Sequence, residues 1–282
     1  MKTQSLSNCT LIVAFAILLL PPLCDFTVAQ TRPESGDPGG HTNRGVQFAR
    51  EKQYDKAIDE FTKAIQAEPR DEKNYLNRAT VYRLVGKRDQ ARADYSKVLE
   101  LRPNSADAYV GRGQAELDQK DLDAALADFE KALTIEPKDT TALRFRAYAF
   151  LEKKDWSRAI EDYNKIIAQM PNDLQAHERR GFAYRSAGKY KEAVGDFTKL
   201  IEAKPDDPAG YRRRSLAYTQ LNEKDKAADD LRAILKLKPD DVEARTRLKL
   251  LEQTPTPANS FVPVPAPSTS ISSATPTPTP RR

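Results

Sequence analysis

Small and large apolar residues recur at fixed places through the middle of the chain. Six consecutive 34-residue units begin at Pro38, Glu72, Ala106, Thr140, Leu174 and Pro208. Positions 20, 24 and 27 of these units hold alanine, a large apolar residue and a small or aliphatic residue, and positions 4, 8 and 11 hold a mostly large, small and aromatic set. Spacings of three and four place each set on one helical face. Each unit is therefore predicted to contain two amphipathic helices, A and B.

Residues that begin or end helices mark the limits of each unit. Position 32 is always proline: Pro69, Pro103, Pro137, Pro171, Pro205 and Pro239. Position 34 is Asp or Ser, whose side chains cap helix N-termini, and Asp37 stands in the equivalent place before the first unit. A helix is therefore predicted to begin at position 1 of every unit, Pro38 included. Gly86, Gly188 and Asn222 at position 15 suit the left-handed backbone that ends helix A, so the two helices should form an antiparallel hairpin.

This array resembles the tetratricopeptide repeat family, whose pattern combines these residue types at positions 4, 8, 11, 20, 24, 27 and 32. The resemblance covers residues 38–241, and Val242–Glu252 looks like the closing cap, so residues 38–252 form the expected repeat domain. Glu116 departs from the pattern, since it stands where the family has an aromatic residue at position 11. The resemblance implies an all-α, right-handed superhelical solenoid of antiparallel helix pairs. It also implies a non-catalytic interaction scaffold whose concave groove, lined by helix A, takes up peptides or partner helices.

The two ends of the chain differ from the repeats. Residues 1–29 carry Lys2, the apolar run Leu11–Leu20 and the small-residue pattern Thr27-Val28-Ala29, which is the layout of a secretory signal peptide. Ten apolar residues are too few to span a bilayer as a helix. We therefore expect cleavage after Ala29 and a secreted or periplasmic protein without a transmembrane span, although an uncleaved anchor remains the alternative. Residues 30–37 would be a linker, and the Pro/Thr/Ser-rich residues 253–282 a disordered tail.

Arginine at position 7 and a carboxylate at position 23 recur in every unit. The arginines are Arg44, Arg78, Arg112, Arg146, Arg180 and Arg214, and the carboxylates are Glu60, Asp94, Asp128, Asp162, Asp196 and Asp230. At about 100° per residue, both positions lie on the same side of the hairpin and equally far from its turn. The sequence therefore predicts structural ion pairs within each unit rather than a row of ligand-binding arginines. If half exposed, each pair is expected to contribute about 0.5–1 kcal/mol.

Positions 2, 5, 6, 9, 12 and 13 of helix A are predicted to face the groove. In the first three units they are mostly small or polar, whereas the last three units carry arginine and aromatic residues, the types that most often anchor interfaces. We expect this half to bind a protein segment with apolar and acidic groups or a free carboxylate; the alternative is a solvated basic face. The predicted partner-binding residues are Arg144, Tyr148, Arg179, Phe182, Arg185, Arg212 and Arg213.

The residues needed for catalysis or cofactor binding do not form a pattern. The two histidines, His41 and His177, occupy position 4, where a packing residue is expected, and both cysteines, Cys9 and Cys24, lie within residues 1–29. No phosphate-binding glycine loop, metal-ligand motif or activated nucleophile is recognisable. We therefore expect no enzyme activity, no cofactor and no metal.

Charge leaves one alternative open. The formal net charge is +5 and the pI is about 9.0, but 46 basic residues are interleaved with 41 acidic ones. This modest excess does not favour nucleic acid as a partner. An anionic cell-wall polymer bound through the basic groove remains the alternative to a protein partner.

Overall fold

The computed structural model describes residues 40–253, so the expected signal peptide, linker and nearly all of the expected tail lie outside the described residues. Within this range there are thirteen α-helices and no strand, and none of these helices is long and apolar enough to cross a membrane. The helices are α1 (His41–Arg50), α2 (Tyr54–Ala67), α3 (Glu72–Leu84), α4 (Arg88–Leu101), α5 (Ala106–Asp118), α6 (Leu122–Ile135), α7 (Thr140–Glu152), α8 (Trp156–Gln169), α9 (Leu174–Ser186), α10 (Tyr190–Ala203), α11 (Pro208–Gln220), α12 (Lys224–Leu237) and α13 (Val242–Gln253).

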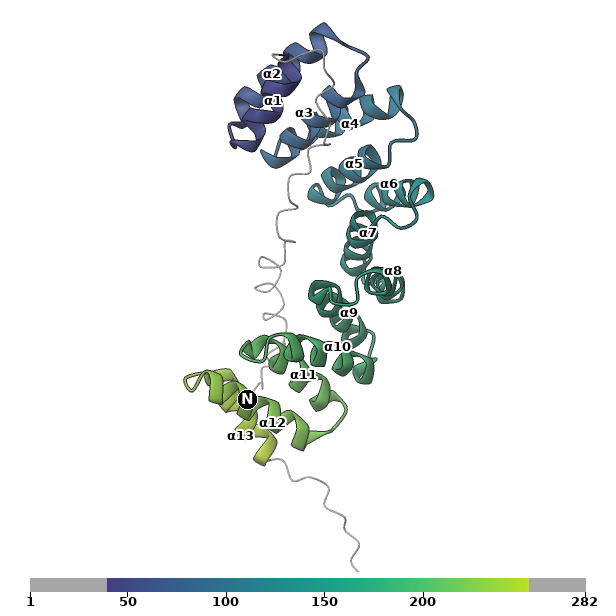
Figure 1. Cartoon of the computed structure of the whole chain (residues 1–282). Coiled ribbons are helices and arrows are strands. Elements are labelled where there is room, and N and C mark those ends of the chain that lie inside the picture. The colour runs from purple at the N-terminus through teal and green to yellow at the C-terminus, as the bar shows by residue number, and fades with distance from the viewer. Residues whose placement is uncertain (1–39, 254–282) are drawn as a thin grey trace, which may run out of the picture.

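Consecutive helices pack as antiparallel pairs, from α1 with α2 to α11 with α12, and α13 packs on α12. The pairs stack into an arc, with the odd-numbered helices along its inner side and the even-numbered helices along its outer side (Figure 1). Contacts between α1 and α3, α3 and α5, and α5 and α7 also join the inner helices directly. The all-α solenoid expected from the 34-residue period is confirmed.

Side chains at position 24 fill the space inside each helix pair. Phe129 and Phe197 are almost completely buried. Each ring lies against a glycine at position 8 of the preceding helix, so that a Cβ placed on Gly113 would come within 2.7 Å of Phe129, and one on Gly181 within 2.7 Å of Phe197. Since protein interiors are close-packed, position 8 is small because the aromatic ring occupies the volume that a larger side chain would take.

The turn inside every helix pair uses one left-handed residue at position 15. Gly86 and Gly188 have φ of 76° and 74°, and Asn222 has φ of 59°. Lysines adopt the same conformation in the other three pairs, with φ of 59° at Lys52, 64° at Lys120 and 59° at Lys154. The left-handed turn predicted from glycine and asparagine is therefore general, and three residues with a β-carbon carry its steric cost.

Replacing Lys154 with glycine is expected to raise the free energy of unfolding by about 0.5–1 kcal/mol, because glycine relieves the left-handed strain and loses part of this gain through its greater unfolded-state entropy. Urea unfolding followed by circular dichroism measures the change. The matched control is Gly188→Ala, which should lose a similar amount through backbone strain alone, since a Cβ there meets nothing within 4 Å. A destabilised Lys154→Gly variant would contradict this account of the turn.

Side-chain caps begin the odd-numbered helices largely as the sequence predicts. Asp71 accepts a hydrogen bond from the N–H of Lys73 at 3.0 Å, and equivalent caps are made by Ser105, Asp139, Asp173, Asp207 and Asp241. The predicted helix start at Pro38 is wrong. α1 begins at His41, because Gly40 has an extended backbone with ψ of 156° and offers no capping side chain.

The predicted pairs between positions 7 and 23 are confirmed in every unit. Arg146, for example, donates from Nε to Asp162 Oδ2 at 2.8 Å and from Nη2 to Asp162 Oδ1 at 2.6 Å. The other pairs are Arg44–Glu60, Arg78–Asp94, Arg112–Asp128, Arg180–Asp196 and Arg214–Asp230.

The condition of half exposure is not met at the carboxylates, because the two helices of a unit pack closely enough to remove these groups from water. Asp162 is only 1% exposed, and the other five carboxylates are also buried. The expectation of about 0.5–1 kcal/mol applies to pairs in water. Buried pairs are far more sensitive to the loss of one partner.

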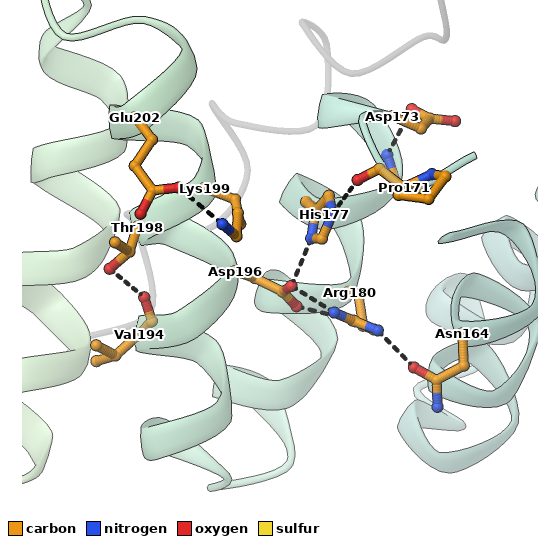
Figure 2. A network of polar contacts seen from close by, with 11 residues as sticks. Asn164, Pro171, Asp173, His177, Arg180, Val194, Asp196, Thr198, Lys199 and Glu202 are labelled. Atoms are coloured by element: carbon orange, nitrogen blue, oxygen red, sulfur yellow. Dashed lines mark hydrogen bonds and ion pairs between the residues drawn. The ribbon is translucent and has the colours of Figure 1, made fainter. Parts of the chain in front are cut away.

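Figure 2 shows how one such pair also joins neighbouring units. Arg180 Nη1 donates to Asn164 Oδ1 on α8 at 2.8 Å while its other nitrogens hold Asp196 on α10. His177 Nδ1 lies 2.7 Å from Asp196 Oδ1, and its Nε2 lies 3.0 Å from the carbonyl oxygen of Pro171. A carbonyl oxygen only accepts, so Nε2 carries a proton in this contact. His177 is thus part of a structural network that ties α8, α9 and α10 together.

Candidate partner-binding groove

The inner side of the arc in its C-terminal half is formed by α7, α9, α11 and α13 (Figure 1). The seven residues predicted to bind a partner lie on the first three of these helices. They are Arg144 and Tyr148 on α7, Arg179, Phe182 and Arg185 on α9, and Arg212 and Arg213 on α11. Six of the side chains are half-buried and Phe182 is exposed, so all seven reach the surface from elements whose backbones are held by packing.

Two of the arginines are bound to the carboxylates that cap the next odd-numbered helix. Arg144 Nη2 donates to Asp173 Oδ2 at 2.5 Å and its Nη1 donates to Gln175 Oε1 at 3.2 Å. Arg212 on α11 makes the equivalent contact with the residue that caps α13: its Nη2 donates to Asp241 Oδ2 at 2.5 Å. The hydrogen bond from Arg212 lowers the pKa of Asp241 below its usual value. Both arginines therefore connect adjacent units.

Arg213 is also neutralised within the protein. Its Nη2 donates to Glu178 Oε1, which lies on the neighbouring α9. Arg212 has a second carboxylate partner in Glu243 on α13, at 2.6 Å from Nη1. Much of the positive charge that the sequence places on this face is thus already balanced, which lowers the attraction of the groove for a general polyanion.

An aromatic and cationic cluster on α9 differs from these pairs. The Phe182 ring is 37% exposed and packs against the Trp156 ring in a T-shaped arrangement, with centroids 6.1 Å apart and an interplanar angle of 80°. The guanidinium of Arg185 lies 5.6 Å from the centroid of Phe182. Burial lowers the pKa of Arg185, and the charges of Arg213 and Arg247 lower it further. We call Trp156, Phe182 and Arg185 the α9 cluster.

Tyr148 lines a small cavity between α7, α8 and α9. The cavity has a volume of about 20 Å³ and is enclosed by Arg144, Phe145, Tyr148, Tyr163, Gln175 and Arg179. This is about the room that one water molecule needs. Burial raises the pKa of Tyr148, and the carboxylate of Glu152 raises it further, so its hydroxyl stays protonated at neutral pH. No group of three or more metal-ligating side chains occurs within residues 40–253.

Comparison with protein families decides the identity of the array. Residues 76–140 and 179–242 match one tetratricopeptide repeat model, and residues 116–178 match another. Together the matches run from residue 76 to residue 242, which is more than half of the 282-residue chain. The chain belongs to the tetratricopeptide repeat (TPR) family. It is a non-catalytic protein-interaction scaffold.

Solved structures agree with the fold of this TPR protein. YrrB, described as a TPR protein with an unusual peptide-binding site, is 25% identical with a TM-score of 0.61, over 67% of this chain and 97% of YrrB. PilW, described as a type IV pilus biogenesis factor, is 19% identical with a TM-score of 0.60, over 74% of this chain and 96% of PilW. A tetratricopeptide repeat protein from Parabacteroides merdae is 24% identical with a TM-score of 0.52, over 75% and 83% of the two chains. No curated protein matches the chain.

The closing helix of the TPR array continues the groove. Counted in the same register, Arg247 on α13 takes position 6, as Arg179 and Arg213 do on α9 and α11, and Leu250 takes position 9, as Phe182 does. Leu250 is 61% exposed. The sequence analysis treated this helix only as a cap and missed both residues, although the 34-residue register would have assigned them.

The 34-residue register also contains a pattern that could have predicted the ion pairs of Arg144 and Arg212. Position 5 of one unit and position 34 of the same unit lie at opposite ends of its sequence, and the structure brings Arg144 to Asp173 and Arg212 to Asp241 at that offset. The sequence analysis assigned the aspartates to helix caps and the arginines to the groove separately. Trp156 of the α9 cluster was missed as well, since it begins α8 and lies outside the groove positions of helix A.

Proposed function

We propose that this TPR protein binds a peptide or helical segment of a partner protein in the groove formed by α7, α9, α11 and α13, outside the cytoplasm. The observation that carries the proposal is the exposed Phe182 ring in contact with Trp156 and Arg185 on the inner side of the arc. Aromatic residues and arginines are enriched among the residues that dominate binding energy. The likeness to YrrB, whose description includes a peptide-binding site, supports a peptide as the ligand.

The extracytoplasmic location rests on residues 1–29, which lie outside the described residues. Their single lysine, apolar run and Thr27-Val28-Ala29 pattern are those of a secretory signal peptide. We propose that the mature protein is secreted or periplasmic, and that its partner belongs to the same compartment.

Replacing Phe182 with alanine is expected to reduce capture of the partner at least about tenfold, because truncating an anchoring aromatic residue costs about 2 kcal/mol or more of binding energy. The full chain and the variant would be immobilised, incubated with the extracytoplasmic fraction and compared by quantitative mass spectrometry. The partner that differs would then be purified and its Kd measured for both proteins by calorimetry.

Met170→Ala is the matched control for this experiment. Met170 is 38% exposed and Phe182 is 37% exposed, but Met170 directly follows α8 and does not belong to an inner helix. It should leave capture unchanged. Equal loss with both variants would point to non-specific apolar binding, and equal retention by Phe182→Ala and the parent would exclude the groove.

An anionic polymer is the second candidate, since arginines dominate this face. The internal partners of Arg144, Arg212 and Arg213 favour the protein ligand over it, because only part of the arginine charge is available. The salt dependence of Kd separates the two candidates. For a polyanion, log Kd rises steeply and linearly with the logarithm of the salt concentration. For a peptide anchored by Phe182, Kd should change little with salt.

A further inference from the structure

Arg185 is a groove cation that forms no ion pair within the part of the chain that the structure describes. Among residues 40–253 its recorded contact is with the face of the Phe182 ring at 5.6 Å, and no carboxylate forms an ion pair with it. Arg144, Arg212, Arg213 and Arg247 each bind a carboxylate. A half-buried guanidinium without an anion has lost part of its hydration without a compensating partner, so this position attracts an anion from outside.

The groups around Arg185 strengthen that attraction. Arg213 on α11 and Arg247 on α13 lie close enough to lower its pKa, and Tyr190 on α10 has a weaker opposite effect. Glu178 and Glu243 are the acidic residues bonded to these two arginines. Three guanidinium groups thus face two carboxylates, and Glu243 is shared with Arg212 as well. The local excess of about one positive charge matches a single carboxylate better than a doubly charged phosphate group or a polymer.

An apolar surface lies directly beside this charge. The exposed Phe182 ring is supported by a T-shaped contact with Trp156, which in turn packs on the hydrophobic core. A ligand side chain that covers Phe182 would remove apolar area from water at about 25 cal/mol per Å². The same contact would reduce the dielectric constant near Arg185 and strengthen its interaction with a carboxylate.

We propose that the α9 cluster is a two-part subsite that takes an acidic side chain through Arg185 and a neighbouring large apolar side chain through Phe182 and Trp156. The proposal rests on the proposed peptide-binding function and names the chemistry of the partner segment. The guanidinium geometry suits bidentate bonding to a carboxylate. Since Arg185 binds no carboxylate among the described helices, it acts on the ligand rather than on stability.

The test is selection from a phage-displayed library of random twelve-residue peptides on the full chain, followed by Kd measurement with the selected synthetic peptides. We expect enrichment of Asp or Glu next to a large apolar residue. Arg185→Gln should bind the selected peptide at least about tenfold more weakly, and changing the peptide's acidic residue to its amide should have little further effect on that variant. This coupling in a double-mutant cycle identifies the contact. Phe182→Ala should retain the acidic preference and lose the apolar one.

The controls separate binding from folding. Arg185→Gln should unfold at the same or a slightly higher urea concentration than the parent, because it removes a half-buried charge with like-charged neighbours. Arg70→Gln, in the exposed turn between α2 and α3, should leave peptide binding unchanged.

Each of the remaining outcomes overturns the subsite. An acidic preference that survives Arg185→Gln overturns the subsite, and so does tighter binding of a peptide with phosphoserine in place of the acidic residue. Selected peptides that depend on Phe182 but show no acidic preference overturn the subsite and leave the proposed function intact. If no peptide is enriched, the peptide-binding function fails and the subsite fails with it.

Discussion

Replacing Arg146 with alanine is expected to lower the free energy of unfolding by about 3 kcal/mol, the range measured when one partner of a buried ion pair is removed. The variant would leave the Asp162 carboxylate, which is 1% exposed, without the two hydrogen bonds that now hold it. The remaining cation is Lys165, whose ammonium is 3.8 Å away on an exposed side chain. The loss should appear as a lower midpoint in urea unfolding followed by circular dichroism.

Two variants test the cause of this loss. Arg146→Met combined with Asp162→Leu should restore most of the stability, because replacing a buried pair by apolar residues of similar size is often neutral. Lys199→Ala breaks the exposed Lys199–Glu202 pair, seen in Figure 2, and should change the stability by less than about 0.5 kcal/mol. If Arg146→Ala lowers the free energy of unfolding no more than Lys199→Ala does, the buried ion pairs do not stabilise the helix pairs.

Replacing Glu116 with glutamine is expected to stabilise the protein by about 2–3 kcal/mol at pH 8. Glu116 occupies position 11 of its unit, is 8% exposed, and has a buried Oε2 without a hydrogen-bond partner in the described part of the chain. Burial and the nearby Asp128 raise the pKa of Glu116 to about 7, although Arg112 opposes the shift. The charged form is therefore penalised in the folded state, and an isosteric side chain that cannot ionise avoids the penalty.

The stability difference between Glu116→Gln and the parent should grow as the pH rises. The pKa of Glu116 rises from 4.5 to about 7 on folding, so between these values the folded state binds the proton and the unfolded state does not. The destabilising effect of Glu116 is complete above pH 7 and disappears as the pH falls towards 4.5. The difference between Glu116→Gln and the parent should thus be largest at pH 8 and small at pH 5.

Urea unfolding of both proteins at pH 5, 6, 7 and 8 measures this difference. Glu136→Gln is the control, since Glu136 is exposed at the end of the neighbouring α6, and it should change the stability little at any pH. A difference for Glu116→Gln that does not vary with pH would mean that folding does not raise the pKa of Glu116.

Most of the fold was predictable because its determinants lie within one unit. Gly113 and Phe129 meet inside a single helix hairpin, and so do Arg146 and Asp162, so the 34-residue pattern reports these contacts directly. The start of α1 was not predictable from the repeat alone, since Gly40 overrides the register there. The three left-handed lysines were likewise set by the turn that the packed hairpin imposes rather than by their own preference.

The helices that carry the candidate groove residues were predictable from the sequence, but the ion pairs of the groove arginines were not. Helical periodicity predicts that Phe182 and Arg185 face the inner side of the arc, and both residues belong to α9. Periodicity does not reveal that Arg213 bonds to Glu178 on another unit or that Trp156 meets Phe182 from the start of α8. These contacts join units, and they depend on how closely one helix pair stacks on the next.

The sequence by itself determined the repeat period, the helix pairs, most of the caps and the face of each helix, because these depend on short-range spacing and local conformational preference. Only the tertiary structure decided that the position 23 carboxylates are buried, and that Arg185 binds no carboxylate of residues 40–253 while Arg213 and Arg247 each bind one. Burial and ion pairing vary over a few ångströms, and those distances are set by the packing of successive units into the arc.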